Sequence, residues 1–277
     1  MQSNINQYIN KLSDRHHEIS LLINHAENLF DKTDESSKKL YSSICRSISI
    51  LLVSHLEGFI KDFVKELILD INQFVAFKDI NKYVKRQYVS SFIIHTENKK
   101  LYEQKIKNLI TKFESIDENL ELADGKYITV SYEPFLYKDN KNPKADILSY
   151  ICKNFGIDNI FGYLKDSTLE IVFENDRIGA NNLIDEIYQN LKDNTLNYPF
   201  NINYDAYQLE KSVTTKAEKT NWEFFLEDLL NTRHNIVHGA TLENIKSHTE
   251  LKDLEQKTIL IQYGIILLLI KNNFTPF

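Results

Sequence analysis

The sequence contains few of the residues that interrupt a regular backbone. Its 277 residues include only 7 glycines and 4 prolines. Both residue types destabilise helix interiors, so their scarcity favours long uninterrupted helices. Methionine and tryptophan occur once each, which leaves 15 tyrosines and 16 phenylalanines to supply much of the core volume. These absences predict a mainly α-helical fold.

Cysteine is also scarce. Cys45 and Cys152 lie in apolar helical contexts, without the paired spacing of a disulfide framework or a zinc site. We expect both thiols to be buried and reduced, as in the cytoplasm. Residues 1–5 are polar and do not resemble a signal peptide. The most apolar run, residues 259–270, is too short for a membrane span, which needs about 20 apolar residues. A cytoplasmic protein that avoids membranes is the expectation.

An excess of positive charge is missing as well. The formal net charge is -6, which excludes a strongly basic protein that coats nucleic acid. Any RNA would have to meet a local basic patch, and the most basic segment is residues 80–118. An exposed helix face is one interpretation of this segment, and an RNA backbone track is the other. The residues proposed for RNA contact are Lys82, Lys85, Arg86, Lys99 and Lys100.

Apolar periodicity divides the chain into three parts. Spacings of three and four predict a helix over residues 3–30 and a central one over about 37–76. Residues 1–118 form the first helical part, residues 119–204 an insertion, and residues 205–277 a second helical part.

The insertion has a different character, because it holds three of the four prolines and four of the seven glycines. Residues 127–132 alternate like a strand, and residues 169–173 are a second strand candidate. Pro143 and Gly156 bracket a short predicted helix. We therefore predict a mixed α/β insertion.

Two capping boxes mark helix starts in the last part of the chain. The spacing of Thr220 and Glu223 opens one helix, and that of Ser247 and Glu250 opens a long closing helix. Gly239 is the expected left-handed stop of the first of these helices.

This helix ends in an unusual concentration of polar chemistry, formed by Arg233, His234, Asn235 and His238. An arginine can clamp a phosphate and a histidine can move a proton, so the set suits reactions at a phosphodiester. On one helix Arg233 and His238 lie about 140° apart, whereas His234 and His238 share a face. The spacing favours a homodimer in which two copies build a shared site.

Three interpretations of the cluster compete. His234 and His238 have a spacing that suits zinc, but no third ligand is evident, so we expect no metal and no other cofactor. In a purely structural interpretation, Asn235 and His238 satisfy backbone groups at the helix end and Arg233 pairs with an acid. The third interpretation is catalysis on RNA.

Glu57 lies in an apolar helical segment and needs a partner if it is buried. Arg233 or a histidine of the cluster could be that partner and would orient the site. Alternatively, Glu57 lies on the exposed edge of its helix and pairs with Lys61.

Residues 228–239 resemble the signature of HEPN-domain ribonucleases, R-x(4–6)-H with a polar residue after the arginine. Residues 51–63 are similar to the second helix of the RiboL-PSP-type branch. The resemblance implies an antiparallel helical bundle and a metal-independent endoribonuclease that uses the ribose 2′-OH. Such enzymes are often toxins or phage-defence effectors. Arg233 and His238 would act at the scissile phosphate, while His234, Asn235 and Glu57 would shape the site.

The resemblance also implies partners. They are single-stranded or tRNA-like RNA, a second copy of the chain, and an antitoxin or defence-system protein. HEPN toxins silenced by a nucleotidyltransferase carry tyrosine two positions after the histidine, where this chain has Ala240, so we expect a different control. The alternative function is a non-catalytic HEPN-like module that binds RNA, a nucleotide or a protein, which the acidic net charge favours slightly.

Overall fold

The computed structural model describes residues 2–95, 97–121, 128–137, 144–210, 218–239 and 246–274. Every regular element within these residues is helical, which confirms the mainly α prediction. The α-helices are α1 (Asn4–Phe30), α2 (Glu35–Phe74), α3 (Lys82–Ser90), α4 (Lys99–Glu121), α5 (Ala145–Asn154), α6 (Ile160–Leu164), α7 (Arg177–Asn194), α8 (Asn221–Val237) and α9 (His248–Phe274). The short 3₁₀ helices are η1 (Phe77–Asp79), η2 (Glu133–Phe135), η3 (Thr168–Phe173) and η4 (Asp205–Tyr207).

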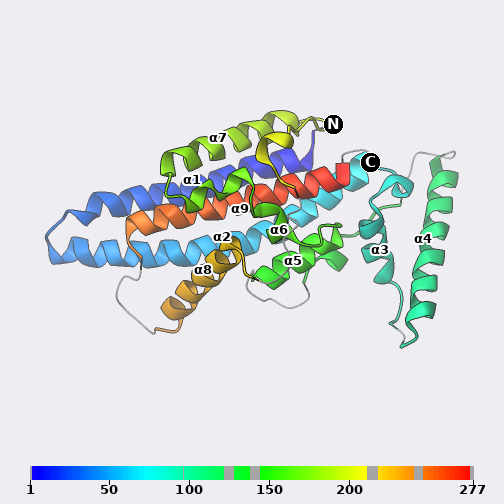
Figure 1. The fold of residues 1–277 in the computed structure, drawn as a ribbon, viewed down its shortest axis with the longest axis horizontal. Helices are drawn as coiled ribbons and strands as arrows, with labels where there is room; N and C mark the ends of the chain where they lie inside the picture. The colour runs from blue at the N-terminus through cyan, green and yellow to red at the C-terminus, as the bar shows by residue number, and fades with distance from the viewer. Residues whose placement is uncertain are drawn as a thin grey trace.

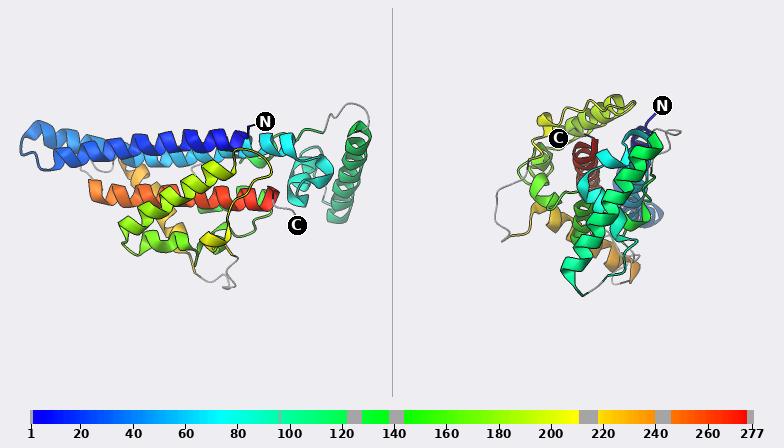
Figure 2. Two further views of the ribbon diagram at one scale, coloured as in Figure 1. Left: turned by 90° about the horizontal axis from the view of Figure 1, so that it is seen from above. Right: turned by 90° about the vertical axis from the view of Figure 1, so that its right-hand side faces the viewer.

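Helices α1, α2 and α9 run side by side along the molecule, and α7 lies across them at an angle (Figures 1 and 2). α1 and α2 form an antiparallel hairpin, α9 packs against both, and α7 covers α1 and α9. α8 packs on α2 and diverges from the bundle toward its C-terminal end (Figure 1). This arrangement is the antiparallel helical bundle expected from the sequence.

The centre of the bundle is α9, whose residues from Thr258 to Ile270 are all buried. A helix that is apolar around its whole circumference must be enclosed by neighbours. α2 is the one helix among the described residues that is long and apolar enough to cross a membrane, judged by length and composition. In this fold its side chains Leu56, Phe59 and Phe63 lie inside the bundle.

Asp70 of α2 fastens the start of α1. Its fully buried carboxylate accepts hydrogen bonds from the Ser3 hydroxyl at 2.5 Å and from the backbone N–H groups of Asn4 at 2.7 Å and Ile5 at 3.0 Å. The first N–H groups of a helix have no partner within the helix, and they favour a negative charge. The carboxylate therefore satisfies donors that burial would otherwise leave unpaired.

Helices α3 and α4 form an arm at the end of the molecule away from α8 (Figure 1). Lys85 is buried in this arm, where its ammonium group lies 2.6 Å from the Glu114 carboxylate. Arg86 pairs through two nitrogens with the Glu103 carboxylate on the neighbouring helix. Two of the basic residues considered for RNA binding therefore hold the arm together.

The strand expected over residues 127–132 is not present in the described part, which begins at residue 128. Val130 is buried between exposed neighbours, so the alternation is real. Its backbone pairs with the side chain of Asn72, which accepts from the Val130 N–H at 2.7 Å and donates to its carbonyl at 2.9 Å. An amide side chain thus takes the place of a neighbouring strand.

The second predicted strand is the 3₁₀ helix η3. Its buried residues are Leu169 and Val172, three positions apart, which is the period of a 3₁₀ helix. The following helix α7 was not predicted. The regular elements in the described part of the insertion are all helices, so the mixed α/β interpretation is wrong. The boundaries at 119 and 204 stay predictions.

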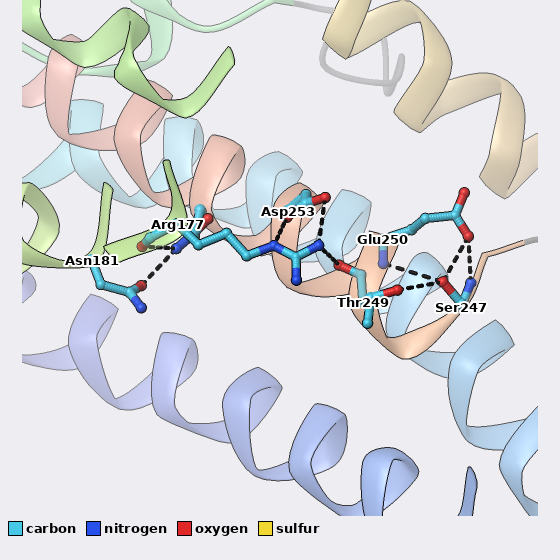
Figure 3. Close-up of polar contacts among 7 residues, drawn as sticks. Arg177, Asn181, Ser247, Thr249, Glu250 and Asp253 are labelled. Atoms are coloured by element: carbon cyan, nitrogen blue, oxygen red, sulfur yellow. Dashed lines mark hydrogen bonds and ion pairs between the residues drawn. The ribbon is translucent and has the colours of Figure 1, made fainter. Parts of the chain in front are cut away.

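A polar network fastens the start of α7 to α9 (Figure 3). The Arg177 guanidinium donates to both Asp253 carboxylate oxygens, at 2.6 and 3.1 Å, and to the Thr249 carbonyl. The Gln256 amide donates to the Arg177 carbonyl and to Asn181. These contacts lie within the first turns of α9, close to where the chain arrives from α8.

Candidate functional site

Helix α8 carries the polar cluster, and its boundaries follow from its sequence. The predicted capping box is present: the Thr220 N–H donates to Glu223 at 2.8 Å, and the Glu223 N–H donates to the Thr220 hydroxyl at 3.3 Å. Trp222 and Leu229 are fully buried and hold one face of α8 on the bundle. The helix ends at Val237 and Gly239 follows with φ of 66°, as the predicted stop requires.

The polar side chains divide between two environments. Arg233 is half-buried, whereas His234, Asn235 and His238 are exposed. The rings of His234 and His238 lie against each other, with centroids 4.3 Å apart and planes at 49°. The cluster therefore presents a pair of imidazoles to solvent and keeps its guanidinium closer to the bundle.

Arg233 reaches across to α2. Its Nη1 donates to Oε1 of Glu57 at 3.0 Å, and the two side chains are 26% and 27% exposed. Of the partners considered for Glu57, Arg233 is therefore the one that the structure shows. Lys61, the alternative partner, is exposed to solvent. A guanidinium has five N–H donors in one plane, so it can hold a carboxylate on one edge and a phosphate oxygen on another.

The chain beyond the cluster is tied back to α8. Lys246 pairs with Asp228 of α8 at 3.0 Å, and its side chain is 19% exposed. The predicted capping box at the start of α9 is also present, since the Ser247 N–H donates to Glu250 at 2.7 Å and the Glu250 N–H donates to the Ser247 hydroxyl at 3.3 Å. Ala240 lies outside the described residues.

The residues that could hold a metal are limited. Among the described residues, no group of three or more histidine, cysteine, aspartate and glutamate side chains is placed to share one ion. His234 and His238 therefore form a pair without a third protein ligand in this part of the chain. The chemistry available to the cluster is that of a cation and two imidazoles.

The basic residues predicted to contact RNA are not adjacent to the cluster. They belong to the α3–α4 arm, whereas the cluster lies at the C-terminal end of α8, in a different region of the molecule (Figure 1). Lys82, Lys99 and Lys100 are exposed there. Lys85 is buried in the arm and Arg86 is held at its surface by Glu103, so RNA contact by the arm stays a prediction that rests mainly on the three exposed lysines.

Sequence reasoning missed a pocket beside α8. Lys144, Ala145 and Asp146, at the start of α5, form one wall, and Lys219 with residues of α8 forms the other. Nothing in the local sequence of residues 144–146 indicates chemistry, because the pocket exists only where α5 and α8 meet.

Comparison with known proteins supports the resemblance of the motif. The family model of RiboL-PSP-HEPN matches residues 10–268. Searches of curated proteins and of solved structures gave no match. The matched region includes α8 with its arginine–histidine cluster and the segment of α2 that holds Glu57. The chain therefore belongs to the RiboL-PSP-HEPN family.

Proposed function

We propose that this protein is a metal-independent endoribonuclease. The observation that carries the proposal is the cluster itself, an arginine held by the Glu57 carboxylate and followed by exposed histidines at a helix end. Membership of the HEPN family adds support, since an R-x4-H motif in this family accompanies RNA cleavage. Arg233 and His238 are the proposed catalytic residues, with His234, Asn235 and Glu57 shaping the site.

The proposed reaction is transesterification within the RNA strand. His238 removes the proton from a ribose 2′-OH, and the oxygen attacks the adjacent phosphorus. Arg233 stabilises the negative charge that builds on the phosphoryl oxygens. The bond to the 5′-oxygen of the next nucleotide breaks, and that oxygen takes up a proton. The products are a 2′,3′-cyclic phosphate and a 5′-hydroxyl, and DNA is excluded because it lacks the attacking group.

A second copy of the chain completes the proposed site. Arg233 and His238 point about 140° apart around α8, so one copy does not close both around one phosphate. Val237, the residue before His238, is 57% exposed, and an exposed apolar side chain beside a functional cluster suits an interface. We expect a homodimer whose interface buries at least about 1,000 Å².

The biological setting follows from the proposed activity. An enzyme that cuts cellular or phage RNA would act as a toxin or defence effector, and it would need restraint by an antitoxin or another defence protein. Cys45 and Cys152 are buried and are not joined in a disulfide, which fits the reducing cytoplasm proposed for the protein.

The activity can be tested with purified protein, total RNA and EDTA. We expect cleavage products that carry 2′,3′-cyclic or 3′-phosphate ends. Arg233→Ala and His238→Ala should each reduce cleavage by at least about 100-fold, because general acid–base catalysis contributes that much or more. His25→Ala is the matched control, since it removes another exposed histidine, on α1, and should cleave normally.

Two outcomes would contradict the proposal. Full cleavage by His238→Ala would remove this residue from the mechanism. RNA binding without any cleavage by the wild-type protein would support the alternative, a HEPN-like binding module.

A further inference from the structure

The pocket between α8 and the start of α5 has the size of a small-ligand site. Its volume is about 290 Å³, near the lower end for pockets that hold small molecules, which suits one nucleotide unit better than a peptide. The residues that line it are Lys144, Ala145, Asp146, Lys219, Glu223, Glu227, Leu230 and Asn231.

The pocket shares a helix face with the two histidines. At about 100° per residue, its four α8 residues span an arc of about 100° that begins at Leu230 and ends at Asn231. Counted from Leu230, His234 lies at about 40° and His238 at about 80°, so both histidines fall within this arc. Arg233 lies outside the arc, about 60° beyond its Leu230 end. A strand lying along this face would pass from the pocket to the histidines.

The separation along the helix also fits a nucleic-acid strand. His238 is seven positions after Asn231, which corresponds to about 10 Å at 1.5 Å per residue. One or two nucleotides of an extended strand bridge this distance. A base seated in the pocket would therefore belong to a nucleotide next to, or one removed from, the phosphate at His238.

The polar groups of the pocket are mainly hydrogen-bond acceptors. Glu227 uses one oxygen to pair with Lys219 at 2.9 Å, and Glu223 uses one in the capping box. Asp146 uses one to accept the Ile147 N–H at 3.0 Å. The second oxygen of each carboxylate makes no hydrogen bond within the described residues, so it is available to an N–H donor.

These properties select a base over a phosphate. Three carboxylates disfavour a phosphate inside the pocket, but they accept hydrogen bonds from an exocyclic amino group. Leu230 offers apolar contact to the ring, and the exposed Lys144 at the mouth can meet the backbone phosphate. Guanine, adenine and cytosine carry an exocyclic amino group with two N–H donors, while uracil has no amino group and offers only the single N–H of its N3.

We propose that this pocket is a base-recognition subsite that binds an amino-bearing base of the RNA strand beside the scissile phosphate. The inference rests on the proposed ribonuclease function for its biological meaning. Binding to the pocket does not depend on cleavage, so the two can be tested separately.

The test uses fluorescent 2′-O-methyl trinucleotides that differ in a single base and cannot be cut through the 2′-OH. We expect the wild-type protein to bind at least one of the guanine, adenine and cytosine probes at least about tenfold more tightly than the uracil probe. One hydrogen bond to a charged acceptor accounts for a difference of that order. The double variant Asp146→Asn, Glu227→Gln should lose this preference. Glu186→Gln, an exposed carboxylate on α7, is the matched control and should keep it.

The possible results separate the two proposals. Equal binding of all four probes by the wild-type protein, or a preference that survives in the double variant, would overturn the subsite, even if the protein cleaves RNA. A base preference that depends on Asp146 and Glu227 in a protein that cuts no RNA would uphold the subsite and refute the nuclease.

Discussion

Replacement of Glu57 by glutamine tests how the fold prepares Arg233. The change removes the negative charge that holds the guanidinium at 3.0 Å and keeps the size of the side chain. Both partners are about one quarter exposed, so the pair lies between a surface ion pair, worth below about 1 kcal/mol, and a buried one, whose disruption costs about 3–5 kcal/mol. We expect Glu57→Gln to lower the free energy of unfolding by about 1–2 kcal/mol.

The effect on activity should be larger than the loss of stability explains. An arginine displaced by about 1 Å from a reacting phosphate can reduce the rate about 100-fold, so we expect a decrease of about 10- to 100-fold in kcat. Cleavage of a labelled RNA at a temperature where the variant remains folded measures this effect, and urea unfolding measures stability.

A matched control lies on the same helix. Asp62 of α2 pairs with Arg15 of α1 at 2.8 Å, away from the cluster. Asp62→Asn breaks a similar carboxylate–arginine pair and should destabilise the protein slightly without changing kcat. If Glu57→Gln cleaved RNA as fast as Asp62→Asn, the idea that Glu57 positions Arg233 would be refuted.

Two further predictions concern stability. Asp70→Asn should lower the free energy of unfolding by about 2–4 kcal/mol in urea titrations, because it weakens four hydrogen bonds to a buried carboxylate. A loss below about 1 kcal/mol would show that the start of α1 is not anchored there. His16 lies beside Gln262 at 2.7 Å, and burial lowers the pKa of His16 from 6.5 to about 4. The unfolded chain then binds the proton more readily, so the wild-type protein should lose stability as pH falls from about 6.5 to 4. The upper limit of this loss is about 3 kcal/mol, and we expect a smaller value because His16 is partly exposed. Unfolding of His16→Gln across the same pH range should lack this component; an identical pH dependence in both proteins would remove His16 as its source.

The parts of the fold that were predicted correctly have strong local signals. The capping boxes at Thr220 and Ser247 define where α8 and α9 begin, since side chain and backbone satisfy each other within four residues. The stop at Gly239 is equally local, because the positive φ favours glycine.

The insertion was misjudged where the decisive partner is distant in sequence. The alternation around Val130 is typical of a strand, but the groups that pair with its backbone come from Asn72, 58 residues away. In α7 the apolar spacing is interrupted by Gly179 and polar residues, and the helix is held by contacts such as that of Arg177 with Asp253 on α9. Such contacts exist only after the chain has folded.

The candidate site shows the same division. The cluster from Arg233 to His238 is visible in the sequence because its residues are consecutive. The sequence alone could not show that Arg233 is the partner of Glu57, because the two residues are 176 positions apart and meet only in the folded chain. Lys85 illustrates the opposite case, since a lysine in a basic segment turned out to be buried against Glu114.

The central claim is that the ribose 2′-OH attacks the phosphate at Arg233 and His238. The most direct measurement uses an RNA cut at a mapped position and a matched RNA with a single 2′-deoxyribose immediately 5′ of that bond. We predict that the wild-type protein, in EDTA, cuts the all-ribose strand and leaves a 2′,3′-cyclic phosphate, and that the single substitution abolishes cleavage at this bond. Undiminished cleavage of the substituted strand, or products with 3′-hydroxyl ends, would contradict the claim.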